Sequence, residues 1–188
     1  MKKNKRISMK NILLSLGLSF LAVVSNAQTF TLKSNDIGGQ ATSKQVFNGF
    51  GCTGENVSPE LHWENVPEGT KSFAVTMFDI DAPTGSGFWH WVVFDIPAGT
   101  TSLPSNAGNV EKDLMPKEAI QGTTDFGKPG YGGPCPPVGH GFHQYMITVY
   151  ALKTDKLGLD KSASPAFVGF NLFANTIAKA SLVMYYKR

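Results

Sequence analysis

Residues 72–96 read SFAVTMFDIDAPTGSGFWHWVVFDI and contain two clear strand patterns. Residues 72–79 alternate between two faces, and one of these faces carries Phe73, Val75, Met77 and Asp79. Alternation of this kind predicts a β-strand. Residues 89–96 are almost continuously apolar, which is typical of a strand that is covered on both sides. Strict alternation in this second strand places His90 on the same face as Val92.

Outside this stretch the sequence also favours strands and turns. Residues 143–152 alternate, and one face carries His143, Tyr145, Ile147 and Val149. Asn48-Gly49 lies between two phenylalanines and predicts a hairpin turn. Residues 122–141 contain 11 Gly or Pro among 20 positions, which predicts a shaped loop that forms a wall rather than a regular element. We therefore predict a mostly β fold, with a largely antiparallel sheet.

One helix and one further strand are expected near the end of the chain. Ser164-Pro165 is typical of an N-cap followed by proline at the first helical position. The apolar residues that recur at helical spacing after it are Ala166, Phe170, Phe173 and Ile177. These residues predict an amphipathic helix, and a last strand is expected at about residues 181–186.

The first 27 residues have the pattern of a secretory signal peptide. A basic stretch precedes an apolar run of 13 residues (12–24), and Ser25-Asn26-Ala27 follows it. This run is shorter than the roughly 20 residues that a membrane-spanning helix needs, and no later run is longer. We predict that residues 1–27 are cleaved, that residues 28–188 form a single domain, and that the protein is periplasmic or secreted.

The charge of the remaining chain excludes one class of partner. Five of the 17 basic residues lie in residues 1–27, so residues 28–188 contain 12 basic and 14 acidic side chains. Proteins that bind nucleic acids need a basic surface, and this chain has no basic run after its first residues. Nucleic acid is therefore not an expected partner.

The two cysteines, Cys52 and Cys135, favour a disulfide. An even number of cysteines in an exported chain is typical of a disulfide rather than of a metal site, and their spacing lacks the pairs that bind zinc. A bridge between residues 83 positions apart would stabilise the fold by roughly 4 kcal/mol. Two separate thiols are the alternative.

Five residues with ionisable side chains lie at or near the ends of the expected strands: Asp79, Asp81, His90, His143 and Tyr145. An aspartate at a strand end is usually a turn former, and a lone histidine in an apolar strand usually belongs to the core. If these side chains converge in a cleft, imidazole N–H and tyrosine O–H groups would bind a small anionic headgroup.

Templates for catalysis fit the sequence poorly. It contains no nucleophile elbow, no HExxH motif, no phosphate-binding P-loop and no dinucleotide fingerprint. A divalent metal would find suitable ligands in Asp79, Asp81, His90 and His143, but we do not predict one. We predict no catalytic residues and no cofactor.

Two segments resemble the phosphatidylethanolamine-binding protein family. FDIDAPTGSGFWHWVVFDIPA (residues 78–98) and GGPCPPVGHGFHQYMITVYAL (residues 132–152) are similar to its two signature regions, above all to its bacterial branch of Raf-kinase-inhibitor-like proteins. The likeness extends to residues 46–79 and 166–186. The resemblance implies a central antiparallel sheet packed on a smaller sheet, with a short helix near the C-terminus.

The resemblance also implies a small cavity at one end of the sheet that binds phosphate-like anions or phospholipid headgroups. Its lining would consist of Asp79, Asp81, His90, Pro136, Pro137, His143 and Tyr145. Cys135 stands where the loop backbone approaches the anion. The chain departs from the family pattern at Ile80, which replaces a proline, and at Gln144, which replaces an arginine. Both departures leave the lining residues intact.

These observations predict a non-enzymatic protein that binds a small anion or a phospholipid headgroup. Two alternatives remain open at this point. One is a hydrolase or lyase that uses His90 or His143 as an acid or base, and the other is a protein-interaction or inhibitory module with a vestigial pocket. The sequence is also compatible with a homodimer.

Overall fold

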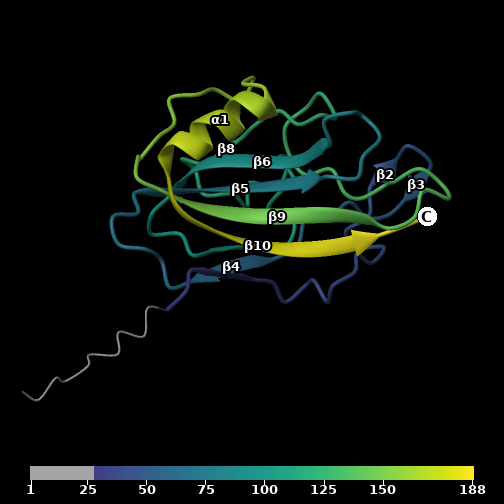
Figure 1. The fold of residues 1–188 in the computed structure, drawn as a ribbon, viewed down its shortest axis with the longest axis horizontal. Coiled ribbons are helices and arrows are strands. Elements are labelled where there is room, and N and C mark those ends of the chain that lie inside the picture. Colours follow the sequence, from purple (N-terminus) through teal and green to yellow (C-terminus); the bar gives the residue numbers. More distant parts are fainter. Residues whose placement is uncertain (1–27) are drawn as a thin grey trace, which may run out of the picture.

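The computed structural model describes residues 28–188 (Figure 1). The predicted signal peptide, residues 1–27, lies outside the described residues, so its cleavage stays a prediction. Among the described residues strands predominate, and α1 (Pro165–Asn175) is the one α-helix. The predicted mostly β fold with a short helix near the C-terminus is confirmed.

A five-stranded antiparallel sheet forms the centre of the domain, in the order β10–β9–β5–β6–β8 (Figure 1). Its strands are β5 (Ser72–Asp79), β6 (Phe88–Pro97), β8 (Ile120–Gln121), β9 (His143–Leu152) and β10 (Thr176–Tyr186). β5 and β9 begin and end at the predicted residues. β6 is one residue longer at each end than predicted, and β10 begins five residues earlier.

A smaller sheet covers one face of the central sheet. It contains β1 (Thr31–Lys33), β4 (Leu61–Glu64) and β7 (Ser102–Leu103) in the order β1–β4–β7. Leu32 and Trp63 of this sheet pack in one buried cluster with Met77, Trp91 and Ile147 of the central sheet. The predicted packing of a central sheet on a smaller one is therefore confirmed.

The helix α1 covers the other face of the central sheet, but with a different stripe of residues than predicted. Its N-cap is Ser164, whose hydroxyl accepts a hydrogen bond from a backbone N–H of the first turn. Val168 and Leu172 are buried against the sheet, whereas Phe173 is 86% exposed. The predicted stripe is therefore wrong as the buried face, because Ala166, Phe170 and Phe173 are exposed and Ile177 belongs to β10. Both stripes have helical spacing, and only the shape of the sheet surface selects between them.

The predicted hairpin exists, but its turn lies two residues later than predicted. β2 (Asn48–Gly49) pairs with β3 (Cys52–Thr53), so Asn48 and Gly49 belong to a strand. The turn consists of Phe50 and Gly51, which have φ angles of 54° and 81°. Two positive φ values are what a two-residue type I′ turn requires. This shift places a phenylalanine, instead of asparagine, at the first turn position.

A β-bulge at His90 changes the face on which this side chain lies. Met77 of β5 pairs with Trp91, and the next residue pair skips one position of β6, so His90 has no partner on β5. A bulge of this kind interrupts the alternation of a strand and turns a side chain to the other face. The His90 ring lies 5.1 Å from the Tyr145 ring, whereas Val92 packs in the cluster under α1. The prediction that His90 shares the face of Val92 is therefore wrong.

Candidate ligand-binding pocket

A pocket of about 130 Å³ lies at one end of the central sheet, where β5 ends and where β6 and β9 begin. Because neighbouring strands are antiparallel, the end of β5 meets the starts of both others, and Asp79 stands opposite Phe88 and Tyr145. The residues that line the pocket are Phe50, Asp79, Ala82, Pro83, Thr84, Phe88, His90, Phe126, Cys135, Pro136, Pro137, His143 and Tyr145.

Most of the predicted ligand residues come together in this lining. Asp79, His90, His143 and Tyr145 supply its polar side chains from the strands, and we call these four residues the pocket floor. Pro136 and Pro137 line the pocket from the Gly/Pro-rich loop. This placement makes the loop a wall of the pocket.

Asp81 does not belong to the lining. Its carboxylate is exposed and accepts a hydrogen bond of 2.8 Å from the backbone N–H of Gln144, which ties the loop after β5 to the start of β9. The backbone N–H of Asp81 donates to the Asp79 carboxylate at 2.9 Å. In the structure, Asp81 therefore orients Asp79 and β9.

A chain of hydrogen bonds runs from Asp79 through His143 to His140. The Nδ1 of His143 donates to the Oδ2 of Asp79 at 2.7 Å. In the neutral ring the Nε2 then carries a lone pair, and it accepts a hydrogen bond of 2.8 Å from the Nδ1 of His140. Both nitrogens of the buried His143 are thus engaged. His140 was not predicted to belong to the site, and its spacing of three residues to His143 was its only signal in the sequence.

His90 is held as a neutral ring with one nitrogen free. Its Nδ1 donates to the backbone carbonyl of Gly132 at 2.7 Å, so in the neutral ring the Nε2 carries a lone pair. That Nε2 lies 4.0 Å from the Oδ2 of Asp79. Desolvation by burial lowers the pKa of His90 to about 4, although the Gly132 carbonyl and the Asp79 charge oppose this shift. A Cβ at Gly132 would lie 2.1 Å from the Phe126 ring and would displace that ring.

The Tyr145 hydroxyl has no hydrogen-bond partner among the described residues, although it is buried. Burial raises the pKa of Tyr145 above its ordinary value, and the nearby Asp79 carboxylate adds to this shift through its charge and as a poorly aligned hydrogen-bond acceptor, so the hydroxyl keeps its proton. A buried donor without a partner is unfavourable by roughly 1–3 kcal/mol. The floor therefore offers an unused donor to whatever enters the pocket.

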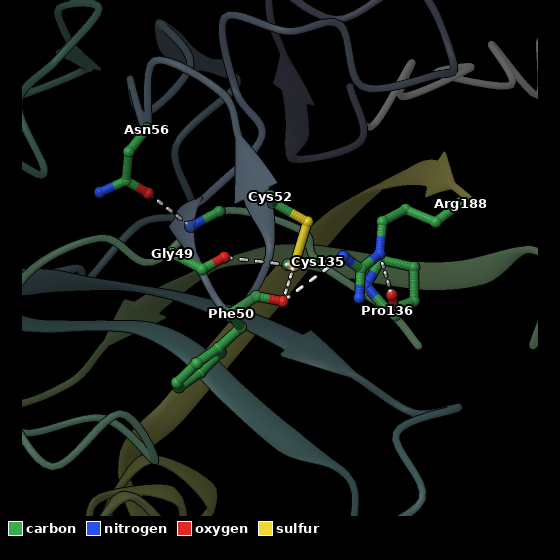
Figure 2. Close-up of a disulfide and its surroundings, with 8 residues drawn as sticks. Gly49, Phe50, Cys52, Asn56, Cys135, Pro136 and Arg188 are labelled. Carbon is green, nitrogen blue, oxygen red and sulfur yellow. Dashed lines mark hydrogen bonds between the residues drawn. A yellow bond between two sulfur atoms is a disulfide. The ribbon is translucent and has the colours of Figure 1, made fainter. Parts of the chain in front are cut away.

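The predicted disulfide is present and fixes one wall of the pocket (Figure 2). Cys52 of β3 bonds to Cys135, and the two Cα atoms lie 6.1 Å apart. Arg188 reinforces this link, since its Nε donates to the Pro136 carbonyl at 2.7 Å and its Nη1 donates to the Phe50 carbonyl at 3.4 Å. The bridge and the arginine together attach the β2–β3 hairpin to the Gly/Pro-rich loop.

Three aromatic side chains that were not predicted as site residues also line the pocket. Phe50, Phe88 and Phe126 come from the β2–β3 turn, the start of β6 and the Gly/Pro-rich loop, and we call these three residues the pocket mouth. Only the folded chain brings them together. No short-range pattern marks them among the 13 phenylalanines of the sequence.

The described part of the chain contains neither a cluster of metal ligands nor a membrane-spanning helix. Residues 28–188 contain no group of three or more His, Cys, Asp or Glu side chains arranged to hold a metal ion. In the same residues no helix has the length and apolar character needed to cross a membrane.

Comparisons with known proteins agree with this architecture. The family model of the phosphatidylethanolamine-binding protein matches residues 37–187. The UPF0098 protein YbcL of Escherichia coli is 50% identical over 95% of this chain and 99% of its own length. The UPF0098 protein YbhB of the same organism is 49% identical over 80% of this chain and 96% of its own length.

Solved structures show the same relationship. The crystal structure of E. coli YbcL, described as a new member of the mammalian PEBP family, covers 85% of this chain and 98% of its own, with a TM-score of 0.83 and 52% identity. A PEBP homolog of Chlamydia trachomatis, CT736, reaches a TM-score of 0.71 at 25% identity, again covering 85% of this chain and 98% of its own. With a family model that matches nearly the whole described domain, the chain belongs to the phosphatidylethanolamine-binding protein family.

Proposed function

We propose that the pocket binds a phosphate-like anion, either free or as part of a phospholipid headgroup, and that the protein carries out no reaction on it. The observation that supports this most is the buried Tyr145 hydroxyl, which has no partner and lines the pocket beside His90. An oxyanion would accept its hydrogen bond. Hydrogen bonds to a charged partner are worth more than those between neutral groups.

Anion binding in this pocket requires a proton on His90. The free Nε2 of the neutral ring is an acceptor and faces the Asp79 carboxylate at 4.0 Å, so the neutral floor repels an anion. A proton on Nε2 turns this acceptor into a charged donor. The bound ligand raises the pKa of His90 from its low value, and the anion therefore enters together with a proton.

The Tyr145→Phe change is expected to weaken binding of inorganic phosphate by roughly 10- to 100-fold, because it removes one donor to a charged ligand. It is not expected to lower the melting temperature, since the hydroxyl has no partner in the free protein. Calorimetric titration with phosphate and a thermal melt measure the two quantities.

A matched control is available in Tyr131. This tyrosine is also buried, but its hydroxyl donates to the Gln45 carbonyl at 3.0 Å, and it does not line the pocket. Tyr131→Phe should lower stability and leave phosphate affinity unchanged. If Tyr145→Phe binds phosphate with the affinity of the wild type, the hydroxyl does not contact the anion.

Acid–base catalysis is a second candidate, because the Asp79–His143–His140 chain resembles a base that is oriented by a carboxylate. The lining offers this base no free thiol, since Cys135 is disulfide-bonded. Turnover of phosphoesters or acyl esters that is lost in His143→Ala would favour this candidate over simple binding.

We also propose that the protein acts outside the cytoplasm. The signal-peptide pattern of residues 1–27 and the disulfide, which persists in oxidising compartments, support this location. N-terminal sequencing of protein from the periplasm or the medium is expected to begin at Gln28. Protein that stays in the cytoplasm with residues 1–27 attached would contradict the proposal.

A further inference from the structure

The pocket is polar at its floor and aromatic at its mouth. The Phe50 and Phe126 rings are nearly parallel, at 15°, with centroids 5.8 Å apart. Phe88 stands against Phe126 at 83° with centroids 4.9 Å apart. The mouth therefore presents both the face and the edge of aromatic rings, and both arrangements are favourable for a further ring.

The size of the pocket determines which part of a ligand meets these rings. Sites for whole drug-sized ligands occupy roughly 300–1,000 Å³, whereas this pocket has about 130 Å³. It can enclose an anionic group and little else. If the anion occupies the floor, the group attached directly to it must lie against the mouth.

Phe50 has features that its local structure does not explain. Its side chain is 71% exposed, and its φ of 54° is one that bulky side chains rarely adopt. Asparagine followed by glycine is the preferred pair for a turn of this type. A residue held in an unfavourable backbone conformation and exposed beside a pocket is a candidate for a role in binding.

The surroundings of Phe50 hold it at the mouth. The disulfide attaches the hairpin through Cys52 to Cys135, which itself lines the pocket. Arg188 donates to the Phe50 carbonyl, and Figure 2 shows the Phe50 ring extending away from Arg188 and from the disulfide. The ring stacks against Phe126 and packs against Phe47 in a tilted arrangement, with centroids 5.4 Å apart.

We propose that Phe50 is a specificity-determining residue that contacts a flat apolar group carried directly by the bound anion. This inference rests on the proposed function of the floor. The ligand class is then a small aryl phosphate, or another phosphate ester with a planar group next to the phosphate, rather than inorganic phosphate or phosphoethanolamine.

The test compares three probes on the disulfide-bonded protein: inorganic phosphate, phenyl phosphate and phosphoethanolamine. Phenyl phosphate is expected to bind roughly 3- to 10-fold more tightly than inorganic phosphate, which is what one aromatic contact contributes. Tighter binding of phosphoethanolamine than of phenyl phosphate would overturn the inference. Failure of all three probes to bind would instead refute the proposed function of the floor.

The decisive variant is Phe50→Asn. Asparagine tolerates the positive φ and restores the preferred turn pair with Gly51, so the hairpin keeps its shape while the ring is lost. The ratio of phenyl phosphate to inorganic phosphate affinity should fall 3- to 10-fold, towards one. An unchanged ratio would show that Phe50 does not contact the ligand.

Two further variants of this protein complete the experiment. Phe173→Ala removes another strongly exposed phenylalanine, which lies on α1 outside the lining, and is expected to leave the ratio unchanged. The double variant Cys52→Ala/Cys135→Ala keeps Phe50 but releases the hairpin, and it is expected to lose the preference for phenyl phosphate as Phe50→Asn does. A full preference in the double variant would show that the disulfide does not position Phe50.

Discussion

Replacing both Cys52 and Cys135 by alanine is expected to lower the free energy of unfolding by about 4 kcal/mol. The disulfide joins residues 83 positions apart, and a cross-link over a loop of this length restricts the unfolded chain strongly. For a domain of this size the loss corresponds to a melting temperature lower by about 10 °C. Denaturant unfolding of the oxidised wild type and of the double variant measures the difference.

The reduced wild type is the matched control for this variant. It should unfold at the same denaturant concentration as the double variant, because both lack the cross-link. A difference of less than about 1 kcal/mol between oxidised and reduced protein would contradict the expectation. It would mean that the hairpin is held by its other contacts, among them the Arg188 hydrogen bonds.

Acidification from pH 6.5 to pH 4 is expected to lower the free energy of unfolding by about 3 kcal/mol through His90 alone. The pKa of this histidine is lowered from 6.5 to about 4 in the folded protein because burial disfavours the charged ring. Between these pH values the unfolded chain binds more protons than the folded one. The contribution is therefore complete above pH 6.5, declines as the pH falls and is lost near pH 4.

Urea unfolding of the wild type and of His90→Gln at pH 7, 6, 5 and 4 isolates this contribution. Carboxylates titrate in both proteins, so the difference between the two pH profiles belongs to His90. His62→Gln serves as the control, since His62 is partly exposed, pairs with Glu60 at 2.8 Å and does not line the pocket. Parallel profiles for the wild type and His90→Gln would contradict a neutral buried His90.

The same titration connects stability with the proposed ligand. Because a bound anion favours the charged ring, saturating phosphate should reduce the loss of stability between pH 6.5 and pH 4 in the wild type. In His90→Gln, phosphate should not change the slope of the profile. If phosphate changes the slope equally in both proteins, anion binding does not depend on the charge of His90.

The sequence alone predicted those features that depend on short-range patterns. The alternation of residues 72–79 and 143–152 marked both ends of β5 and β9, because side chains two positions apart in a strand share a face. The signature segments placed Asp79, His143 and Tyr145 at the ends of these strands. The antiparallel register then brings them together. The even cysteine count predicted the disulfide.

The tertiary structure decided the features that depend on contacts between distant segments. The position of His90 on the floor follows from a bulge, and a bulge is defined only by how β6 pairs with β5. The buried stripe of α1 was selected by the sheet surface that receives Val168 and Leu172. The pocket mouth and its attachment through Arg188 likewise join residues far apart in the chain. Local periodicity determines which residues share a face, whereas packing between elements determines what that face meets.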